Sequence, residues 1–244
     1  MSRATRAVLG QTRVELTLTL RRGESLLVSF LIPVGILVFF TKVDAVNTTV
    51  RSPVDFLVPG VLALAVMSTA MVSLGIATGF ERRYGVLKRL GSTPLSRGGL
   101  LVAKTINVLV IELLQTIVIV VTGLVLGWEV TGGAVLAAVF LLLGTVAFAG
   151  VGMLMAGTLR AEANLAAANA MFLVLLFLGG MAYPLHKLPD ALQTFARALP
   201  AAALSESVRD ALGGVSFPWG SAGVLLAWAI VAPLVAVRFF RWEE

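Results

Sequence analysis

Long stretches without a charged residue dominate the pattern of this chain. Six such runs lie between charged residues or His186, with lengths of 17, 25, 24, 30, 23 and 27 residues, and only Glu112 interrupts one of them. A helix needs about 20 apolar residues to cross a bilayer, whereas the strands of a membrane barrel alternate over about ten. The pattern therefore predicts an all-α, polytopic membrane protein with six transmembrane helices, within residues 25–41, 56–80, 105–128, 130–159, 163–185 and 211–237.

The composition agrees with a membrane protein and removes several kinds of site. The chain is 58% hydrophobic and 13% charged, whereas ordinary soluble domains are roughly a quarter charged. It has no cysteine, so disulfides and thiolate metal ligands are excluded, and the single histidine, His186, leaves little material for a histidine-rich metal centre. No small-residue cleavage site follows the first run, and we therefore expect that run in the mature protein.

The positions of lysine and arginine predict the orientation of the helices. The N-terminal segment, the connections after the second and fourth runs, and the C-terminal tail together hold 14 of the 19 basic residues. Because basic residues gather in cytoplasmic loops, both termini are expected in the cytoplasm, and the protein in the plasma membrane. The net charge of +6 then reflects topology and attraction to anionic lipids, and we predict no nucleic-acid partner.

Residues 1–22 form a polar segment with regularly spaced apolar positions. The i, i+4 spacing of its apolar stripe favours an amphipathic helix that lies in the membrane interface. The sequence VELTLTL within it alternates with period two, which is typical of a strand, but a strand edge would have no evident partner in this chain. We therefore predict a helix, with its stripe at Ala4, Val8, Thr12, Leu16 and Leu20.

Residues 185–214 form the longest connection on the outer side. Pro189 with Asp190, and later Pro200, are typical first-turn residues of two short helices, and each helix would have one apolar face. Such helices can re-enter the outer leaflet, or they can form an ordinary structured loop that packs on the bundle. The sequence leaves both interpretations open.

The segment 81–97, with the sequence ERRYGVLKRLGSTPLSR, concentrates six charged residues in 17 positions. Its first ten residues predict a short helix, Gly91 predicts the end of this helix, and Thr93-Pro94 bends the chain back toward the bilayer. A short cytosolic helix with an exposed apolar side suits a groove on a partner protein. The alternative is a solvated basic loop that only enforces orientation.

The segment GGLLVAKT, residues 98–105, differs by one residue from the phosphate-loop pattern GxxxxGK[ST], because Ala103 replaces the second glycine. That pattern needs a glycine-rich loop between a strand and a helix, and no strand is predicted here. We expect Lys104 instead to extend toward the cytoplasmic headgroups. Neither a metalloprotease nor a hydrolase motif is present, so the chain is predicted to have no active site, bound cofactor or metal ion of its own.

A few polar side chains fall within the predicted transmembrane helices. Glu112 lies about 12 Å past Lys104 along its helix, with Gln115 one turn away as an expected partner. An intramembrane carboxylate can line a substrate path or bind a cationic substrate, and it can also be a structural group bonded to a neighbouring helix. Asn164 and Asn169 are expected to hydrogen-bond across helices, which favours a role in packing. Glu112, Gln115 and the two asparagines are the candidate residues of a substrate path.

Two patches of this sequence match a known pattern. The first matches the stretch ERERGTLERLLVTPVSR and a later lysine, and it departs from that stretch at Val86 and Lys88, where threonine and glutamate are usual. The second has a proline, two Leu-Pro pairs and an arginine after the fifth run, at Pro184, Leu188-Pro189, Leu199-Pro200 and Arg209. With both patches, the chain resembles the ABC-2 type membrane subunits of ATP-binding-cassette exporters, and within them the compact drug-resistance type. The matches in the first patch are Glu81, Arg82, Gly85, Leu87, Arg89, Leu90, Thr93, Pro94, Ser96 and Arg97, with Lys104 beyond.

The resemblance implies a single transmembrane domain over residues 1–244, with residues 1–22 as an elbow helix, 81–97 as a coupling helix and 185–214 as re-entrant helices. It implies pairing with a second permease subunit, identical or different, and with two ATPase subunits that bind ATP and Mg²⁺. It implies export of a hydrophobic or amphipathic substrate, such as a drug, a lipid or a lipid-linked glycan. The residues expected to couple to the ATPase are Glu81, Arg82, Gly85, Leu87, Leu90, Thr93, Pro94 and Arg97.

Two other functions stay open on the sequence. A secondary transporter driven by an ion gradient tends to show matched broken helices in two halves and several buried ionisable groups. In this chain Glu112 alone gives only weak support for such a transporter. A membrane assembly subunit would have no transport of its own. Co-purification with an ATPase separates an exporter from both.

Overall fold

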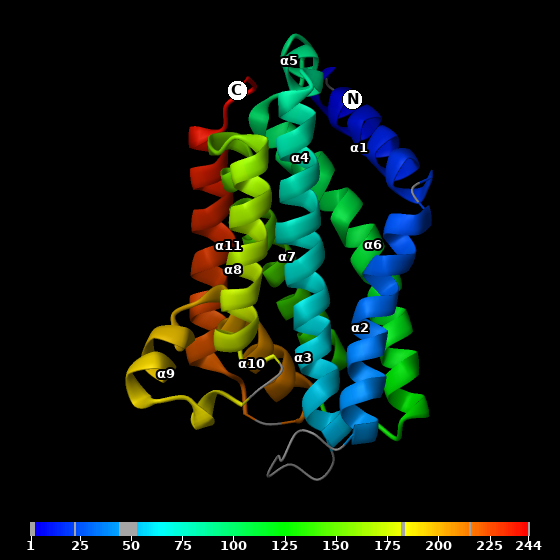
Figure 1. Cartoon of the computed structure of the whole chain (residues 1–244), viewed down its shortest axis with the longest axis vertical. Helices are drawn as coiled ribbons and strands as arrows, with labels where there is room; N and C mark the ends of the chain where they lie inside the picture. The colour runs from blue at the N-terminus through cyan, green and yellow to red at the C-terminus, as the bar shows by residue number, and fades with distance from the viewer. Residues whose placement is uncertain (1–2, 22, 44–52, 182–183, 215, 244) are drawn as a thin grey trace.

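The computed structural model describes residues 3–21, 23–43, 53–181, 184–214 and 216–243. Within these residues every long element is a helix, and the long helices stand side by side in one bundle (Figure 1). No strand occurs in the described part of the chain. The prediction of an all-α protein is therefore confirmed.

Among the residues that the structure describes, five helices are long and apolar enough to cross a membrane. One is a continuous rod over Pro53–Arg83, which combines α3 (Pro53–Met67), the π-helical segment η1 (Ser68–Ser73) and α4 (Leu74–Arg83). The helix of the first predicted run, α2 (Gly23–Val43), has a shorter apolar stretch, Leu27–Val43. The sixth span thus stays a prediction. Besides the rod Pro53–Arg83, the helices that are long and apolar enough to span a membrane are α6 (Arg97–Val125), α7 (Ala134–Thr158), α8 (Ala161–Leu178) and α11 (Trp219–Phe239).

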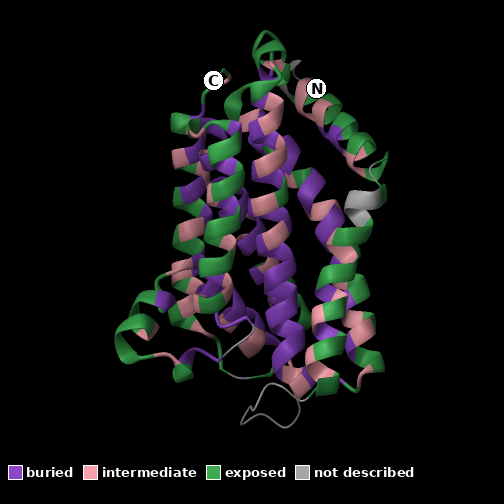
Figure 2. Cartoon of the chain, viewed as in Figure 1, coloured by how far each residue is buried: buried purple, intermediate pink, exposed green. Residues whose placement is uncertain are grey.

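The rod Pro53–Arg83 forms the centre of the bundle and is its most buried span. Figure 2 shows α3 buried almost along its whole length, whereas the outer helices are exposed on one side. The rod packs closely on α7, because Gly75 faces the backbone of Gly152 and a Cβ at Gly75 would lie 3.1 Å from the Gly152 carbonyl oxygen. Backbones can approach this closely only where both helices carry small residues.

The N-terminal helix α1 (Arg3–Arg21) confirms the helical interpretation of this segment, and the alternating VELTLTL stretch forms no strand. The helix packs on the first half of α6 and runs obliquely beside the bundle (Figure 1). Thr12 and Glu15 are buried, whereas the apolar side chains of Leu9, Val14 and Leu18 are about half exposed. Whether α1 lies in the membrane interface as an elbow helix stays a prediction.

The segment 185–214 forms two helices, as expected, together with the short 3₁₀ helix η2 (Leu185–Lys187). Helix α9 (Asp190–Arg197) follows Pro189, and α10 (Pro200–Leu212) begins with Pro200. The two helices have different surroundings. Helix α10 is buried against α3, α7 and α11, whereas α9 stands outside the bundle with Leu192 and Phe195 exposed.

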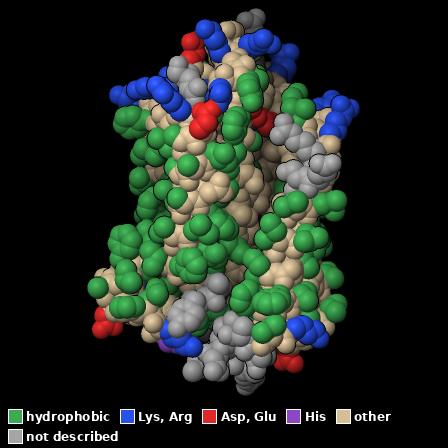
Figure 3. Space-filling view, viewed as in Figure 1, with side chains coloured by type: hydrophobic (Ala, Val, Ile, Leu, Met, Phe, Trp, Pro, Cys, Tyr) green, Lys and Arg blue, Asp and Glu red, His purple; other side chains and the backbone are tan. Residues whose placement is uncertain are grey.

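The charged side chains gather at the two ends of the molecule, and most of the basic ones gather at one end. Figure 3 shows a broad middle zone of apolar side chains, with lysine and arginine concentrated at the end that holds both termini and the short helix α5 (Val86–Gly91). We call this the basic end. The distribution agrees with the loop charges that predict the orientation, and the orientation itself stays a prediction.

Candidate functional site

The segment 81–97 at the basic end is not the single short helix that the sequence predicts. Glu81 and Arg82 belong to the last turn of α4, and the chain then turns at Gly85 before α5 begins at Val86. Gly85 has φ of 71°, a left-handed conformation that glycine adopts without steric cost. The expected helix stop is confirmed, because α5 ends at Gly91.

One buried side chain and the C-terminal residues hold α5 in place. Leu87 is fully buried beneath the helix. Gly91 lies against the ring of Trp242, since a Cβ at this position would be 3.2 Å from the indole. Lys88 forms an ion pair of 3.3 Å with Glu243. The short helix is therefore supported from one side only.

The other side of α5 and the turn after it are exposed. Tyr84 is 72% exposed and Val86 is 44% exposed, and Arg89 lies beside them on the surface. Of the residues predicted to contact a partner, Thr93, Pro94 and Arg97 are exposed, whereas Gly85 and Leu90 are half-buried and the remaining three face the interior or its edge. This surface, which we call the α5 face, consists of Tyr84, Val86, Lys88, Arg89, Thr93 and Pro94.

Arg82 and Arg83 fasten the end of α4 to the connection between α7 and α8. Arg82 is buried, and its Nη2 donates a hydrogen bond of 2.6 Å to the carbonyl oxygen of Leu159, directly after the last residue of α7. A cation at a helix C-terminus also interacts favourably with the helix dipole. Arg83 forms an ion pair with Glu162 in the first turn of α8. Arg82, which is expected from the sequence to couple to the ATPase, thus forms contacts within the bundle.

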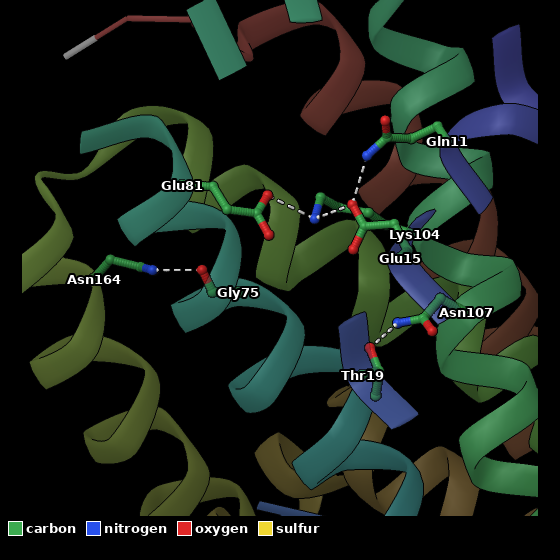
Figure 4. Close-up of polar contacts among 8 residues, drawn as sticks. All are labelled: Gln11, Glu15, Thr19, Gly75, Glu81, Lys104, Asn107 and Asn164. Carbon is green, nitrogen blue, oxygen red and sulfur yellow. Dashed lines mark hydrogen bonds and ion pairs between the residues drawn. The ribbon is translucent and has the colours of Figure 1, made fainter. Parts of the chain in front are cut away.

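The expectation that Lys104 extends toward the headgroups is wrong. Its side chain is buried, with 1% of its surface exposed. Its Nζ lies 2.8 Å from Glu15 Oε1 of α1 and 2.8 Å from Glu81 Oε2 of α4 (Figure 4). Gln11 Nε2 donates a further bond of 2.8 Å to the same Glu15 oxygen. A buried ammonium is costly unless it is paired, and the packing of α1 over α6 supplies that partner. We call Lys104, Glu15 and Glu81 the ionic triad.

The sequence predicts that Glu112 and Gln115 bond to each other. In the structure each of them bonds instead to residues of other helices. Glu112 accepts a hydrogen bond from the hydroxyl of Thr145 on α7. Gln115 Nε2 donates to the Ser29 carbonyl oxygen of α2 at 3.0 Å, and its Oε1 accepts from Thr69 of η1 at 3.1 Å. Both side chains are buried and connect α6 to its neighbours, which supports the structural alternative for Glu112.

The two asparagines of α8 differ. Asn164 is buried, and its Nδ2 donates a bond of 2.8 Å to the Gly75 carbonyl oxygen of α4, so the predicted cross-helix bond is confirmed (Figure 4). Asn169 is exposed and bonds to the Leu165 carbonyl oxygen of its own helix. The prediction of a cross-helix bond is therefore wrong for Asn169.

At the end of the bundle opposite the basic end, Arg209 ties α10 to the chain that follows α8. Its Nη2 donates a hydrogen bond of 2.8 Å to the Gly180 carbonyl oxygen, and its guanidinium lies 4.1 Å from the ring centroid of Phe56. Burial lowers the pKa of Arg209 to about 10, so the side chain is still charged at neutral pH. His186 is exposed at this end.

The described residues contain no group of three or more acidic, histidine or cysteine side chains that could hold a metal ion. The segment GGLLVAKT lies inside α6, which begins at Arg97 with Ser96 as its cap. Ser96 Oγ accepts a bond of 3.0 Å from the Gly99 amide. The segment is thus continuous helix rather than a loop that could wrap a phosphate.

Comparison with known proteins gives two matches. A family model described as ABC-2 type transporter matches residues 8–212. A protein of Bacillus subtilis (strain 168), named "Putative transport permease YvfS", is 26% identical over 245 residues, which cover 96% of this chain and 97% of that protein. The family model thus begins within α1 and ends with α10, so it includes the segment 81–97 but not α11, whereas the similarity to the Bacillus protein covers nearly the whole chain.

Proposed function

Because the chain belongs to the ABC-2 type transporter family, we propose that this membrane permease is the membrane-spanning subunit of an ATP-driven exporter in the plasma membrane. Two such permease subunits, identical or different, assemble with two ATPase subunits that bind ATP and Mg²⁺. The substrate is hydrophobic or amphipathic and moves outward. The chain itself contributes no ATPase site. Its role is to receive a displacement from the ATPase subunits and to convert it into a rearrangement of the helices of the bundle.

The observation that carries this proposal is the attachment of α5 to the central rod. The rod Pro53–Arg83 has 31 residues and ends two residues before α5. At 1.5 Å per residue its length is about 46 Å, which is enough to cross a membrane. A displacement of α5 is therefore applied directly to the most buried helix of the molecule.

The contacts at the end of the rod support transmission to other helices. Glu81 is joined through Lys104 to α6 and α1, and Arg82 and Arg83 are joined to the α7–α8 connection. Packed elements held in this way move between discrete arrangements rather than deform continuously. A partner that seats on the α5 face and changes position on ATP binding would then move these helices together.

Purification and transport with the same preparation test this proposal. The chain would be tagged, expressed together with candidate ABC ATPase subunits of the same organism, and reconstituted into inside-out vesicles. We expect the ATPase to co-purify, and uptake of an amphipathic dye to need ATP and to continue when ionophores collapse the ion gradients. Uptake without ATP that ionophores abolish would indicate a secondary transporter, and absence of both uptake and an ATPase would indicate an assembly subunit.

A further inference from the structure

A cavity of about 140 Å³ lies between α1, α2, the π-helical segment η1, α4 and α6. The ionic triad and Asn107 contribute to its lining (Figure 4). Since about 10 to 15 Å³ of such volume holds one water molecule, the cavity is large enough for a small ligand headgroup. It is separate from Glu112, which does not line it.

Polar residues from several helices line this cavity together with apolar ones. Eight of its thirteen lining residues are polar or charged, including Thr69 and Ser73 from η1 and Ser29 from α2. Polar groups inside transmembrane bundles are costly and commonly mark a ligand or ion pathway. Segments of π-helix within α-helices also occur frequently at functional sites.

The charges of the cavity favour a positively charged ligand. Two carboxylates, Glu15 and Glu81, face one ammonium, Lys104, so the formal charge of the lining is negative. The side chain of Lys104 is 1% exposed, whereas those of Glu15 and Glu81 are 11% and 27% exposed. Of the three charged side chains, the two carboxylates are thus more exposed than the ammonium.

Asn107 gives independent evidence for a missing hydrogen-bond donor. Its side chain is 8% exposed and lines the cavity. Nδ2 donates a bond of 3.1 Å to Thr19 Oγ1, but the buried Oδ1 has no hydrogen-bond partner within the described residues. Buried acceptors are nearly always satisfied in folded proteins, so this oxygen is expected to accept a hydrogen bond from a donor inside the cavity, and a ligand N–H can replace water in that role.

From these observations we propose that the cavity binds the protonated amine of an amphipathic organic cation. The N–H groups of the amine donate to Asn107 Oδ1 and to carboxylate oxygens of Glu15 and Glu81. The apolar part of the ligand lies against Leu18 and Ile111, which line the same cavity. A quaternary ammonium has the charge without the N–H donors and therefore binds more weakly, and an anion of the same length is excluded.

Binding at this position also reaches the α5 face. An amine that approaches Glu81 competes with Lys104 for its carboxylate, and Glu81 lies in the last turn of α4, immediately before Gly85 and α5. Occupancy of the cavity therefore loosens the attachment of α4 to α1 and α6. The assignment of this amine as the exported substrate rests on the proposed function, whereas its binding to the chain does not.

Direct binding to the isolated chain tests the site. The full chain would be placed in nanodiscs of phosphatidylglycerol, and binding of labelled octylammonium would be measured against empty nanodiscs, with octyltrimethylammonium and octyl sulfate as competitors. We expect octylammonium to compete best, octyltrimethylammonium at least fivefold less well, and octyl sulfate not to compete. Equal competition by octyl sulfate would overturn the proposal.

Two substitutions separate the site from the fold. Glu81→Gln removes one carboxylate but leaves Lys104 its partner Glu15, and Asn107→Leu removes the unpaired acceptor and leaves every ion pair intact. Each should weaken octylammonium binding at least tenfold, and the matched control Glu129→Gln, exposed on the connection between α6 and α7, should change it less than twofold. Wild-type affinity in both variants, with normal gel-filtration profiles, would rule out the site.

The same amine chemistry can come from a lipid headgroup or from a free amphiphile. Nanodiscs that contain phosphatidylethanolamine distinguish the two, because a bound lipid amine would reduce octylammonium binding and a lipid that does not enter the cavity would leave it unchanged. In the complete assembly, octylammonium should stimulate ATP hydrolysis, and Glu81→Gln should remove the stimulation. If octylammonium binds but does not stimulate ATP hydrolysis, the binding site is supported and its role in transport is overturned. If no ATPase assembles with the chain, only the proposed function is overturned.

Discussion

The two short helices α5 and α10 lie at opposite ends of the bundle and are stabilised in opposite ways. Helix α10 has 13 residues, of which ten are buried among α3, α7 and α11. Helix α5 has six residues, with only Leu87 buried, and it depends on a turn at Gly85 and on contacts with the C-terminal residues. An isolated helix of six residues is unstable in water. The comparison indicates that α10 is part of the core, whereas α5 is a surface element, in agreement with the docking role proposed for it.

The largest expected effect is the loss of the folded protein on substitution in α10. Leu204 is fully buried and faces Gly144 of α7. Leu204→Asp places an unpaired charge in the bundle at a cost of several kcal/mol, and we expect no monodisperse protein after extraction in mild detergent. Leu192→Asp on the exposed α9 is the matched control and should be recovered at wild-type yield. Normal recovery of Leu204→Asp would contradict the assignment of α10 to the core.

Removal of the central cation from the ionic triad should have the next largest effect. Lys104→Met leaves Glu15 and Glu81 without their common partner, and loss of one member of a buried ion pair costs about 3 to 5 kcal/mol. We expect a clear fall in the melting temperature of the detergent-solubilised protein. Lys42→Met, at an exposed position, is the control.

A triple variant sharpens this prediction. Lys104→Met combined with Glu15→Gln and Glu81→Gln leaves no charge at the three positions of the ionic triad, and most of the lost stability should return, because uncharged groups of similar size replace a buried ion network well. If the triple variant melts no higher than Lys104→Met alone, the charges are not the cause of the loss.

Substitution on the α5 face should leave the fold intact and act on the partner. Val86 is 44% exposed, so Val86→Asp should change the melting temperature by no more than a degree or two. At an interface it places a charge against an apolar groove, and we expect binding of the ATPase to weaken at least tenfold in a pull-down titration. Unchanged ATPase binding in both Val86→Asp and Tyr84→Asp would mean that this face is not the docking surface.

The smallest expected effect concerns the ion pair between Lys88 and Glu243. Both side chains are more than half exposed, and exposed ion pairs contribute less than about 1 kcal/mol. Lys88→Ala should leave the melting temperature almost unchanged, with any difference disappearing at high salt. A large destabilisation would show that α5 is held more firmly than its contacts indicate.

The helices and their ends were largely predictable, because the length of an uncharged run and the positions of proline and glycine determine the local backbone structure. Pro200 and Gly91 marked helix boundaries correctly. The break at Gly85 was missed, although a glycine in the middle of the predicted ten-residue helix was a signal for it. These are properties of short segments of chain, and sequence reasoning reaches them.

The partners of the buried polar groups were not predictable in the same way. In a bilayer the lipid-facing and the core-facing sides of a helix are both apolar, so the pattern does not tell which side of α8 is buried. For this reason Asn164 and Asn169 looked equivalent, although one is buried and the other exposed. Lys104 was misjudged because its burial depends on α1, which is about 90 residues away in the chain and wraps over α6.

The π-helical segment η1 has a geometric consequence for the far end of the central rod. A π-type turn holds one residue more than an α-helical turn, and one residue corresponds to about 100° of rotation around the axis. Every side chain of α4 is therefore rotated by about this angle relative to an uninterrupted helix. Glu81 points toward Lys104 with η1 present, so the length of one turn in the middle of the rod decides which way its tip at the basic end faces.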